Sequence, residues 1–96
     1  MELLNFFKID IGEVMARTIL DDHMWAQLEQ IMRDKRCKSH ANNRNVMEAI
    51  LWKIRTGSPW RDVPSELCPW STAFNRFNRW AQAGLWDDFF LLTRRS

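Results

Sequence analysis

The spacing of apolar residues between Ser71 and Gln82 constrains the fold of this chain more than any other feature of the sequence. On a helical wheel of about 100° per residue, the apolar side chains of this segment fall within an arc of about 120°. They are Ala73, Phe74, Phe77, Trp80 and Ala81. An amphipathic helix draws most of its stability from covering its apolar face. We therefore expect a helix that Ser71 caps and Gly84 closes, packed against other helices with its three aromatic rings in the core.

The opposite side of this predicted helix is polar, yet the segment contains neither an acidic residue nor a lysine. The polar side chains on it and on its flanks are Thr72, Asn75, Arg76, Asn78, Arg79 and Gln82. Arginine pairs with guanine in the major groove, and asparagine and glutamine pair with adenine. Ser71, the expected N-cap, adds a hydroxyl where helix amides bind phosphate. The pattern predicts a DNA-binding face.

Two further helices are expected upstream. The stretch LDDHMWAQLEQIM offers an aspartate N-cap and predicts a helix from about 22 to 33. The stretch NRNVMEAILWKIRTG begins with Asn42 or Asn43 as a cap and ends at Gly57, a residue suited to the left-handed position after a helix. Between them, DKRCKSHANN has no periodicity, which indicates an exposed loop or a flexible basic arm lying along phosphates.

Downstream of Gly57 the sequence predicts a short helix, a tight turn and the longer helix between Ser71 and Gly84. Ser58 and Pro59 suit a helix start, and Pro64 limits this helix to a turn or two. After Gly84, LWDDFFLL predicts a last amphipathic segment that packs back over the bundle. The expected fold is all-α, a small helical bundle containing a helix-turn-helix.

Trp52 lies on the side of its predicted helix opposite to the apolar arc, together with Glu48 and Arg55. A neighbouring element of the same chain or a separate partner would have to cover this ring. Covering within the chain is the interpretation we favour.

Length and charge set limits on the function. A chain of 96 residues makes one small domain, and six Trp and six Phe supply its core. The net charge is only +2, but residues 33–61 hold eight basic side chains against two acidic ones. This concentration of charge is typical of a nucleic-acid footprint, although a solvated helix surface has the same composition.

No cofactor, metal site or membrane partner is expected from the sequence. Cys37 and His40 resemble half of a zinc site, but their spacing to Cys68 and His23 matches no zinc module, so we expect two ordinary thiols. The acidic residues at 62, 66, 87 and 88 form no catalytic set. The sequence has no apolar run long enough to cross a bilayer and no signal peptide, so we expect a cytoplasmic protein.

The motifs RTGSPWRDVP and PWSTAFNRFNRW identify a resemblance that runs from about residue 16 to residue 90. They are similar to the N-terminal domain of bacterial insertion-sequence transposases of the IS-five group, with Val63 where the family usually has Leu. The resemblance implies a helix-turn-helix domain that binds double-stranded DNA at the element's terminal inverted repeats. It places Ser71, Asn75, Arg76 and Arg79 on the recognition helix. It also implies that Arg55 and Arg61 support that helix from its flanks.

The resemblance also implies that catalysis belongs to a separate domain. The family's enzymes carry an RNase H-like domain in which three acidic residues hold two divalent metals for strand cleavage and transfer. This chain ends at Ser96, before that region, so we expect a non-enzymatic first-frame product or a truncated remnant. We expect an N-terminal extension over 1–15, the domain over 16–93 and a tail over 94–96, with Met1 or Met15 as the start.

The alternative function is regulatory. In it the chain is an inhibitory fragment that pairs with full-length transposase, or with itself, through Trp52 and the last helix. A third hypothesis, an active nuclease, predicts metal-dependent nicking by the isolated chain, which we do not expect.

Overall fold

The computed structural model describes the backbone of residues 18–94 and the side chains of residues 18–89. The described chain forms four α-helices and one turn of 3-10 helix, with no strand: α3 (Asp22–Asp34), α4 (Asn43–Thr56), η1 (Trp60–Asp62), α5 (Trp70–Gln82) and α6 (Leu85–Arg94). The predicted all-α class is confirmed. The expected extension over 1–15, and most of the expected tail, lie outside the described residues.

The ends of α3 and α4 form as the sequence predicts. Asp21 caps α3, and its Oδ1 accepts a hydrogen bond from the Met24 amide at 2.8 Å. Gly57 ends α4 with φ 70°, in the left-handed region that favours glycine, and its amide donates to the Lys53 carbonyl at 3.0 Å. Asn42 occupies the N-cap position of α4, but its side chain makes no capping hydrogen bond.

The start of α5 differs from the prediction. Pro69 is the N-cap residue, and its carbonyl accepts the Thr72 amide at 3.0 Å and the Ala73 amide at 3.3 Å. Ser71 therefore lies inside the first turn, and the prediction that it caps the helix is wrong. The backbone of Pro69 is extended (φ −59°, ψ 139°), as an N-cap residue requires, so the N-cap lies two residues earlier than the expected Ser71.

The element before α5 is a single turn, within the turn or two that the sequence allows. Where the sequence predicts a short helix, the structure has the single 3-10 turn η1, followed by an irregular segment over 63–69. Pro64 is the physical reason, because its ring and missing amide prevent η1 from continuing. The connection from α4 to α5 therefore consists mostly of turns.

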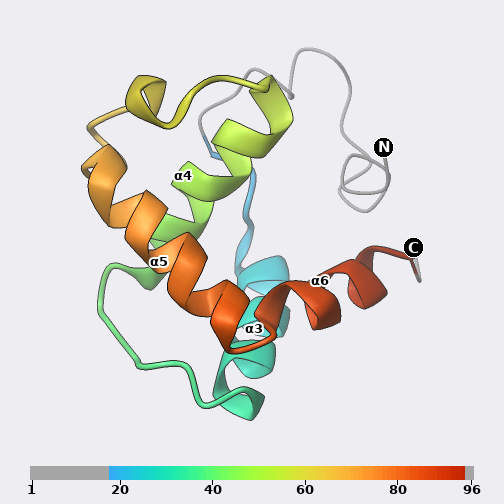
Figure 1. The fold of residues 1–96 in the computed structure, drawn as a ribbon. Helices are drawn as coiled ribbons and strands as arrows, with labels where there is room; N and C mark the ends of the chain where they lie inside the picture. The colour runs from blue at the N-terminus through green and yellow to red at the C-terminus, as the bar shows by residue number, and fades with distance from the viewer. Residues whose placement is uncertain (1–17, 95–96) are drawn as a thin grey trace.

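The helices pack around α5. It lies against α4, η1 and α6, while α3 packs against α6. Figure 1 shows α5 crossing α4, with the loop between α3 and α4 passing close to the second half of α5. The long loop and the recognition helix predicted from the sequence thus lie next to each other.

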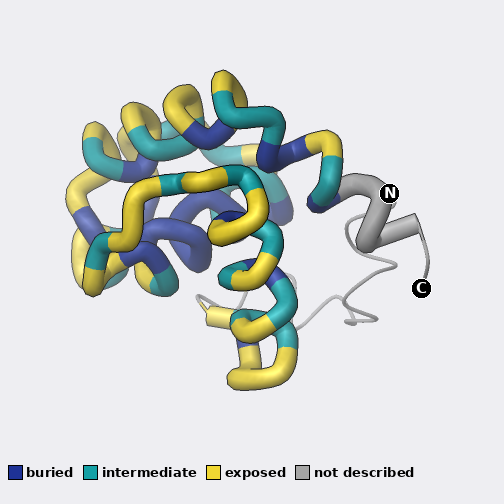
Figure 2. The backbone as a smooth tube through the Cα atoms, turned by 90° about the horizontal axis from the view of Figure 1, so that it is seen from below, coloured by how far each residue is buried: buried dark blue, intermediate teal, exposed yellow. Residues whose placement is uncertain are grey.

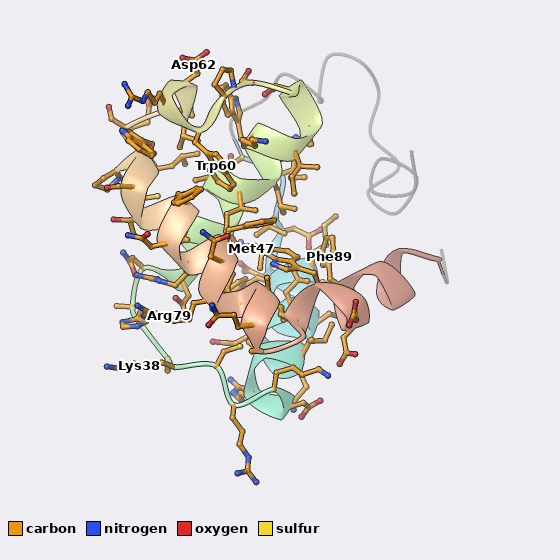
Figure 3. The ribbon with its side chains drawn as sticks, viewed as in Figure 1. Lys38, Met47, Trp60, Asp62, Arg79 and Phe89 are labelled. Carbon is orange, nitrogen blue, oxygen red and sulfur yellow. The ribbon has the colours of Figure 1, made fainter. Side chains whose placement is uncertain are left out.

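The core lies where α4, α5 and α6 meet. Figure 2 shows buried backbone along the inner sides of the helices and exposed positions along the outer sides. Met47 and Phe89, labelled in Figure 3, lie in this interior, and Trp80 is only 2% exposed. Leu85 and Trp86 of α6 are buried as well, so α6 covers the bundle as predicted.

One prediction about this core is wrong. Phe74 is 39% exposed and Ala81 is exposed, whereas Ala73 and Trp80 are buried and Phe77 is partly buried. The covered arc of α5 is narrower than its apolar arc, because α4 and α6 reach only the side that carries Ala73, Phe77 and Trp80. Phe74 lies beyond the edge of that contact.

The polar side of α4 is covered from within the chain. Glu48 is buried, and its two carboxylate oxygens accept the amides of Ile19 and Leu20, each at 2.9 Å. Arg44 donates to the Leu20 carbonyl at 2.9 Å. Trp52 is partly buried and packs against the core, as the favoured interpretation predicted. No helix in the described part of the chain is long and apolar enough to cross a membrane.

Candidate nucleic-acid interface

The exposed side of α5 is polar along its centre. Ser71, Asn75, Asn78 and Gln82 are all exposed, and their spacing of three or four residues places them in one row along the helix. Nothing acidic stands between Trp70 and Gly84. A row of amides and hydroxyls without carboxylates offers donors and acceptors to a polar ligand without repelling an anionic one.

The two edges of this row have different chemistry. Arg79 is exposed at one edge, and Phe74 and Trp70 are exposed at the other, at 39% and 38%. Figure 3 shows Arg79 projecting from α5 on the same side of the molecule as Lys38 of the loop. One edge of the exposed face is thus cationic and the other aromatic.

Arg76 is less free than its place on the helical wheel suggested. Its Nη1 donates to Asn43 Oδ1 at 2.7 Å and to Asn42 Oδ1 at 3.1 Å, at the start of α4. Loss of hydration, and then the charge of Arg79, lower the pKa of Arg76 below its ordinary value, which leaves the guanidinium charged at neutral pH. Arg76 therefore ties α5 to α4 and contributes positive charge from a partly buried position.

The two arginines predicted to support α5 lie in different places. Arg61 is exposed on η1, and its guanidinium lies 5.5 Å from the centre of the Trp70 ring, a cation–π distance. Arg55 is 8% exposed on α4, and loss of hydration lowers its pKa against the opposing effect of Glu48. Arg61 shares a surface with the start of α5, whereas Arg55 lies inside the domain.

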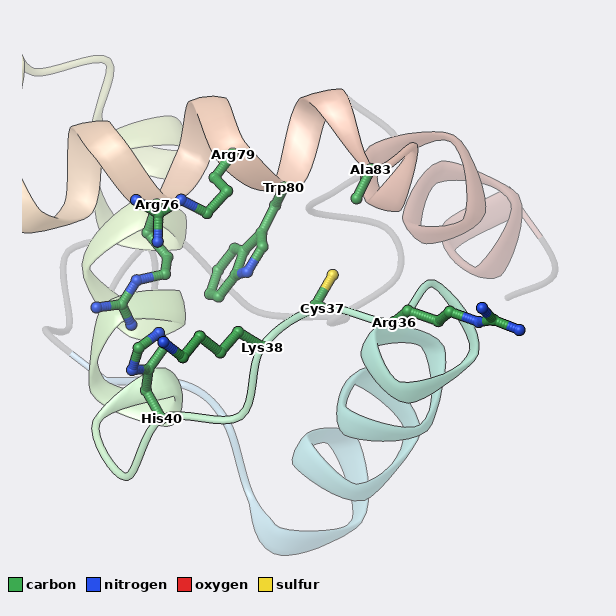
Figure 4. A pocket seen from close by; sticks show the side chains of 8 residues that line it. All are labelled: Arg36, Cys37, Lys38, His40, Arg76, Arg79, Trp80 and Ala83. Atoms are coloured by element: carbon green, nitrogen blue, oxygen red, sulfur yellow. The ribbon is translucent and has the colours of Figure 1, made fainter.

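A pocket of about 250 Å³ separates the α3–α4 loop from α5. Figure 4 shows side chains of the loop on one side and of α5 on the other. The lining residues are Arg36, Cys37, Lys38, His40, Arg76, Arg79, Trp80 and Ala83. Arg76 and Arg79 were predicted at the interface from the sequence, whereas the position of the loop residues beside them was not. The sequence feature that indicated a basic site here is the stretch from 33 to 38. Its position relative to α5 depends on the tertiary fold.

Metal ligands do not gather in the described part of the chain. No three His, Cys, Asp or Glu side chains there are grouped to hold a metal ion. Cys37, in the pocket, and Cys68, in the core, are free thiols. The chemistry available at this surface is hydrogen bonding and positive charge.

Comparison with known proteins assigns the family. The sequence model of a family described as "Putative transposase of IS4/5 family" matches residues 20–90. The chain belongs to this transposase family. The match covers α3, α4, η1, α5 and the first part of α6 of this IS4/5 family member, and it confirms the resemblance carried by RTGSPWRDVP and PWSTAFNRFNRW.

Two curated relatives of this IS4/5 family member are also similar in sequence. It is 33% identical over 82 residues to the "Insertion element IS402 uncharacterized 16.2 kDa protein" of Burkholderia cepacia, a match that covers 76% of the chain and 56% of that protein. It is 35% identical over 54 residues to "Uncharacterized protein y4sN" of Sinorhizobium fredii (strain NBRC 101917 / NGR234), which covers 56% of the chain and 43% of that protein. The chain thus spans about half the length of these relatives. No solved structure matches it.

Proposed function

We propose that this chain is the DNA-binding part of an insertion-sequence transposase and that it recognises the terminal inverted repeats of its element. The observation that carries the proposal is the exposed row of Ser71, Asn75, Asn78 and Gln82 on α5, with Arg79 at its edge and no acidic residue in the helix. Membership of the IS4/5 transposase family supports it, because a transposase must find the ends of its element.

In this proposal α5 is the recognition helix and lies in the major groove. Asn75 and Gln82 belong to the exposed row, and their side-chain amides can pair with both the N6 and N7 positions of adenine. Ser71 and Thr72, in the first turn, hold a phosphate together with the helix amides. Arg61 adds positive charge beside that turn. Arg55 has no role in the contact, because it is buried.

The isolated chain binds DNA and does not cleave it. Asp62 and Glu66 are exposed on the connector, and Asp88 lies 3.5 Å from Lys35, an ion pair between α6 and the loop. These carboxylates lie on separate elements and do not converge on a common point in the described residues. We therefore expect no strand nicking when the purified chain is incubated with the element's ends and Mg²⁺.

The test is a pair of binding titrations. The chain is titrated with a duplex carrying the terminal repeat of the element that encodes it, and with a scrambled duplex of the same composition, each at two salt concentrations. We expect tighter binding to the repeat, and affinity for both duplexes that falls as salt rises. Equal affinity for the two duplexes, or affinity independent of salt, contradicts the proposal.

Variants of α5 separate base reading from general charge. Asn75→Ala is expected to weaken binding to the repeat by about 1–3 kcal/mol and to leave binding to the scrambled duplex nearly unchanged. Gln30→Ala is the matched control, because Gln30 is an exposed amide on α3 whose Nε2 donates only to Asp34 on its own helix, at 3.0 Å. If both variants behave alike on the repeat, α5 is not the helix that reads it.

A further inference from the structure

Four cationic residues line the pocket between the α3–α4 loop and α5, and Figure 4 shows the Arg36 side chain pointing away from the other three. Lys38 and Arg36 come from the loop, and Arg76 and Arg79 come from α5. Trp80, Cys37 and Ala83 complete the lining, so basic groups surround a partly apolar surface (Figure 4). Such a pocket suits a compact anion whose charged oxygens stay among the basic groups.

In the described part of the chain, no carboxylate faces into this pocket. None of the lining residues is acidic. Ion pairs that join Arg33 to Glu29, Lys35 to Asp88 and Arg44 to Asp22 lie outside the pocket lining. Arg76 is hydrogen-bonded, but its acceptors are the neutral amides of Asn42 and Asn43. Lys38, Arg76 and Arg79, with no carboxylate beside them among the described lining residues, create a positive potential, which favours an anionic ligand.

The imidazole of His40 lies within this positive potential. Its Nε2 is enclosed and has no hydrogen-bond partner among the described residues. Loss of hydration, and then the charges of Arg76, Lys38 and Arg79, lower its pKa below the ordinary value. The groups that face it are therefore cations from both the loop and α5. An anion in the pocket would offset these charges and raise the pKa of His40 again.

We propose that this pocket binds a phosphate group between Lys38 and Arg79, and that in the DNA complex it holds a backbone phosphate beside the bases that α5 reads. The second half of the proposal rests on the proposed function. Lys38 and Arg79 are exposed and approach from opposite sides of the pocket, so both can reach the same group. Arg79 then contacts the DNA backbone rather than guanine. The loop becomes a second DNA-binding element and fixes the orientation of α5 on the duplex.

The first test uses the whole chain without DNA. Inorganic phosphate is titrated against the protein while the ring proton resonances of both histidines are followed by NMR over a range of pH, with chloride at matched ionic strength as the reference. We expect phosphate to raise the pKa of His40 and to leave His23, which is exposed on α3 and outside the pocket, unchanged.

A variant and a control make this test specific. In the double variant with Lys38→Gln and Arg79→Gln, the response of His40 to phosphate is expected to be lost; both side chains are exposed, so the fold should persist. Arg33→Gln removes an exposed charge from α3 and should leave the response intact. Equal responses of the two histidines, or a His40 response that persists in the double variant, would contradict phosphate binding in the pocket.

The second test uses DNA. Lys38→Gln and Arg79→Gln are each expected to weaken binding to the repeat and to the scrambled duplex by a similar factor, and to lower the slope of log K against log salt by about 1. Because binding raises the pKa of His40, affinity should also fall as pH rises through that raised value, and His40→Asn should remove this dependence.

The outcomes of the two tests separate the two proposals. Phosphate binding in the pocket without any preference for the repeat supports the phosphate site and contradicts the proposed function. Specific DNA binding with an unchanged salt slope in both variants supports the proposed function. The same result contradicts the proposal that the pocket holds a phosphate of the DNA backbone. A loss confined to the repeat in Arg79→Gln assigns Arg79 to a base and overturns its role in the pocket.

Discussion

Arg76 and Asn43 are 33 residues apart in the sequence and are joined by a hydrogen bond of 2.7 Å, from Arg76 Nη1 to Asn43 Oδ1. The amide of the same Asn43 donates through Nδ2 to the Lys38 carbonyl at 3.1 Å. One buried side chain at the start of α4 therefore connects α5 to the loop. This connection sets the distance between the two sides of the basic pocket.

Replacing Asn43 by alanine tests this connection. Asn43 is 6% exposed, so the Lys38 carbonyl loses its amide donor and Arg76 loses its nearest acceptor in a partly buried place. We expect Asn43→Ala to lower the free energy of unfolding by about 1–3 kcal/mol in urea titrations. Asn45→Ala, at an exposed position on the same helix, should change it by less than about 0.5 kcal/mol. Similar losses in the two variants would contradict the structural role of Asn43.

Trp80 and Phe74 are the least and the most exposed aromatic residues of α5, so their replacement should affect stability very differently. Trp80 is 2% exposed, whereas Phe74 is 39% exposed and touches mainly Trp60 and Trp70, with ring centres 5.7 Å and 6.4 Å away. Trp80→Ala is expected to cost about 3–5 kcal/mol of stability, as for other buried large aromatic residues. Phe74→Ala should cost much less, because much of its ring stays in water in the folded state. Thermal or urea unfolding of both variants checks this, and equal losses would place Phe74 back in the core.

Local pattern was enough to predict the helices but not which arc of each helix is covered. The sequence correctly predicted an aspartate cap at Asp21 or Asp22 and the left-handed Gly57, because each depends on neighbours within one helical turn, and it predicted the burial of Trp80 from its place in the apolar arc. It misplaced Phe74 because a helical wheel gives directions around an axis and says nothing about how far the neighbouring helices extend. That extent is a tertiary property.

The candidate interface, like the core, could be predicted only in part from the sequence. Asn75 and Gln82 are exposed as predicted, since they lie opposite the apolar arc. The attachment of Arg76 to α4 and the approach of Lys38 to Arg79 could not be predicted, because both depend on contacts between residues far apart in the sequence. The loop itself has no periodicity, so nothing local indicated which helix it would lie beside.

Gly57 supplies a prediction about the turn after α4. Its φ of 70° lies in the left-handed region, and an added Cβ would meet nothing within 4 Å. The cost of Gly57→Ala therefore comes from backbone strain alone, and we expect about 1–2 kcal/mol. Gly57→Asn should cost less, because asparagine tolerates this conformation better. Urea titration of the two variants checks the order, and an alanine variant as stable as the parent would show that the turn is free to change.

Glu48 supplies a prediction about pH. Burial raises the pKa of this carboxyl above its ordinary value of 4.5, although the amides of Ile19 and Leu20 and the charges of Arg55 and Arg44 act in the opposite direction. The folded chain thus binds this proton more tightly than the unfolded chain does. Its contribution to stability is fully present below the unfolded pKa and is lost as pH rises through the folded pKa. Glu48→Gln cannot titrate, so the stability of the parent relative to this variant should fall as pH rises from about 4 towards 7. Urea titrations of both proteins across that range measure the difference. If the parent instead becomes more stable relative to Glu48→Gln as pH rises, the hydrogen bonds and arginine charges outweigh burial and lower the pKa of Glu48.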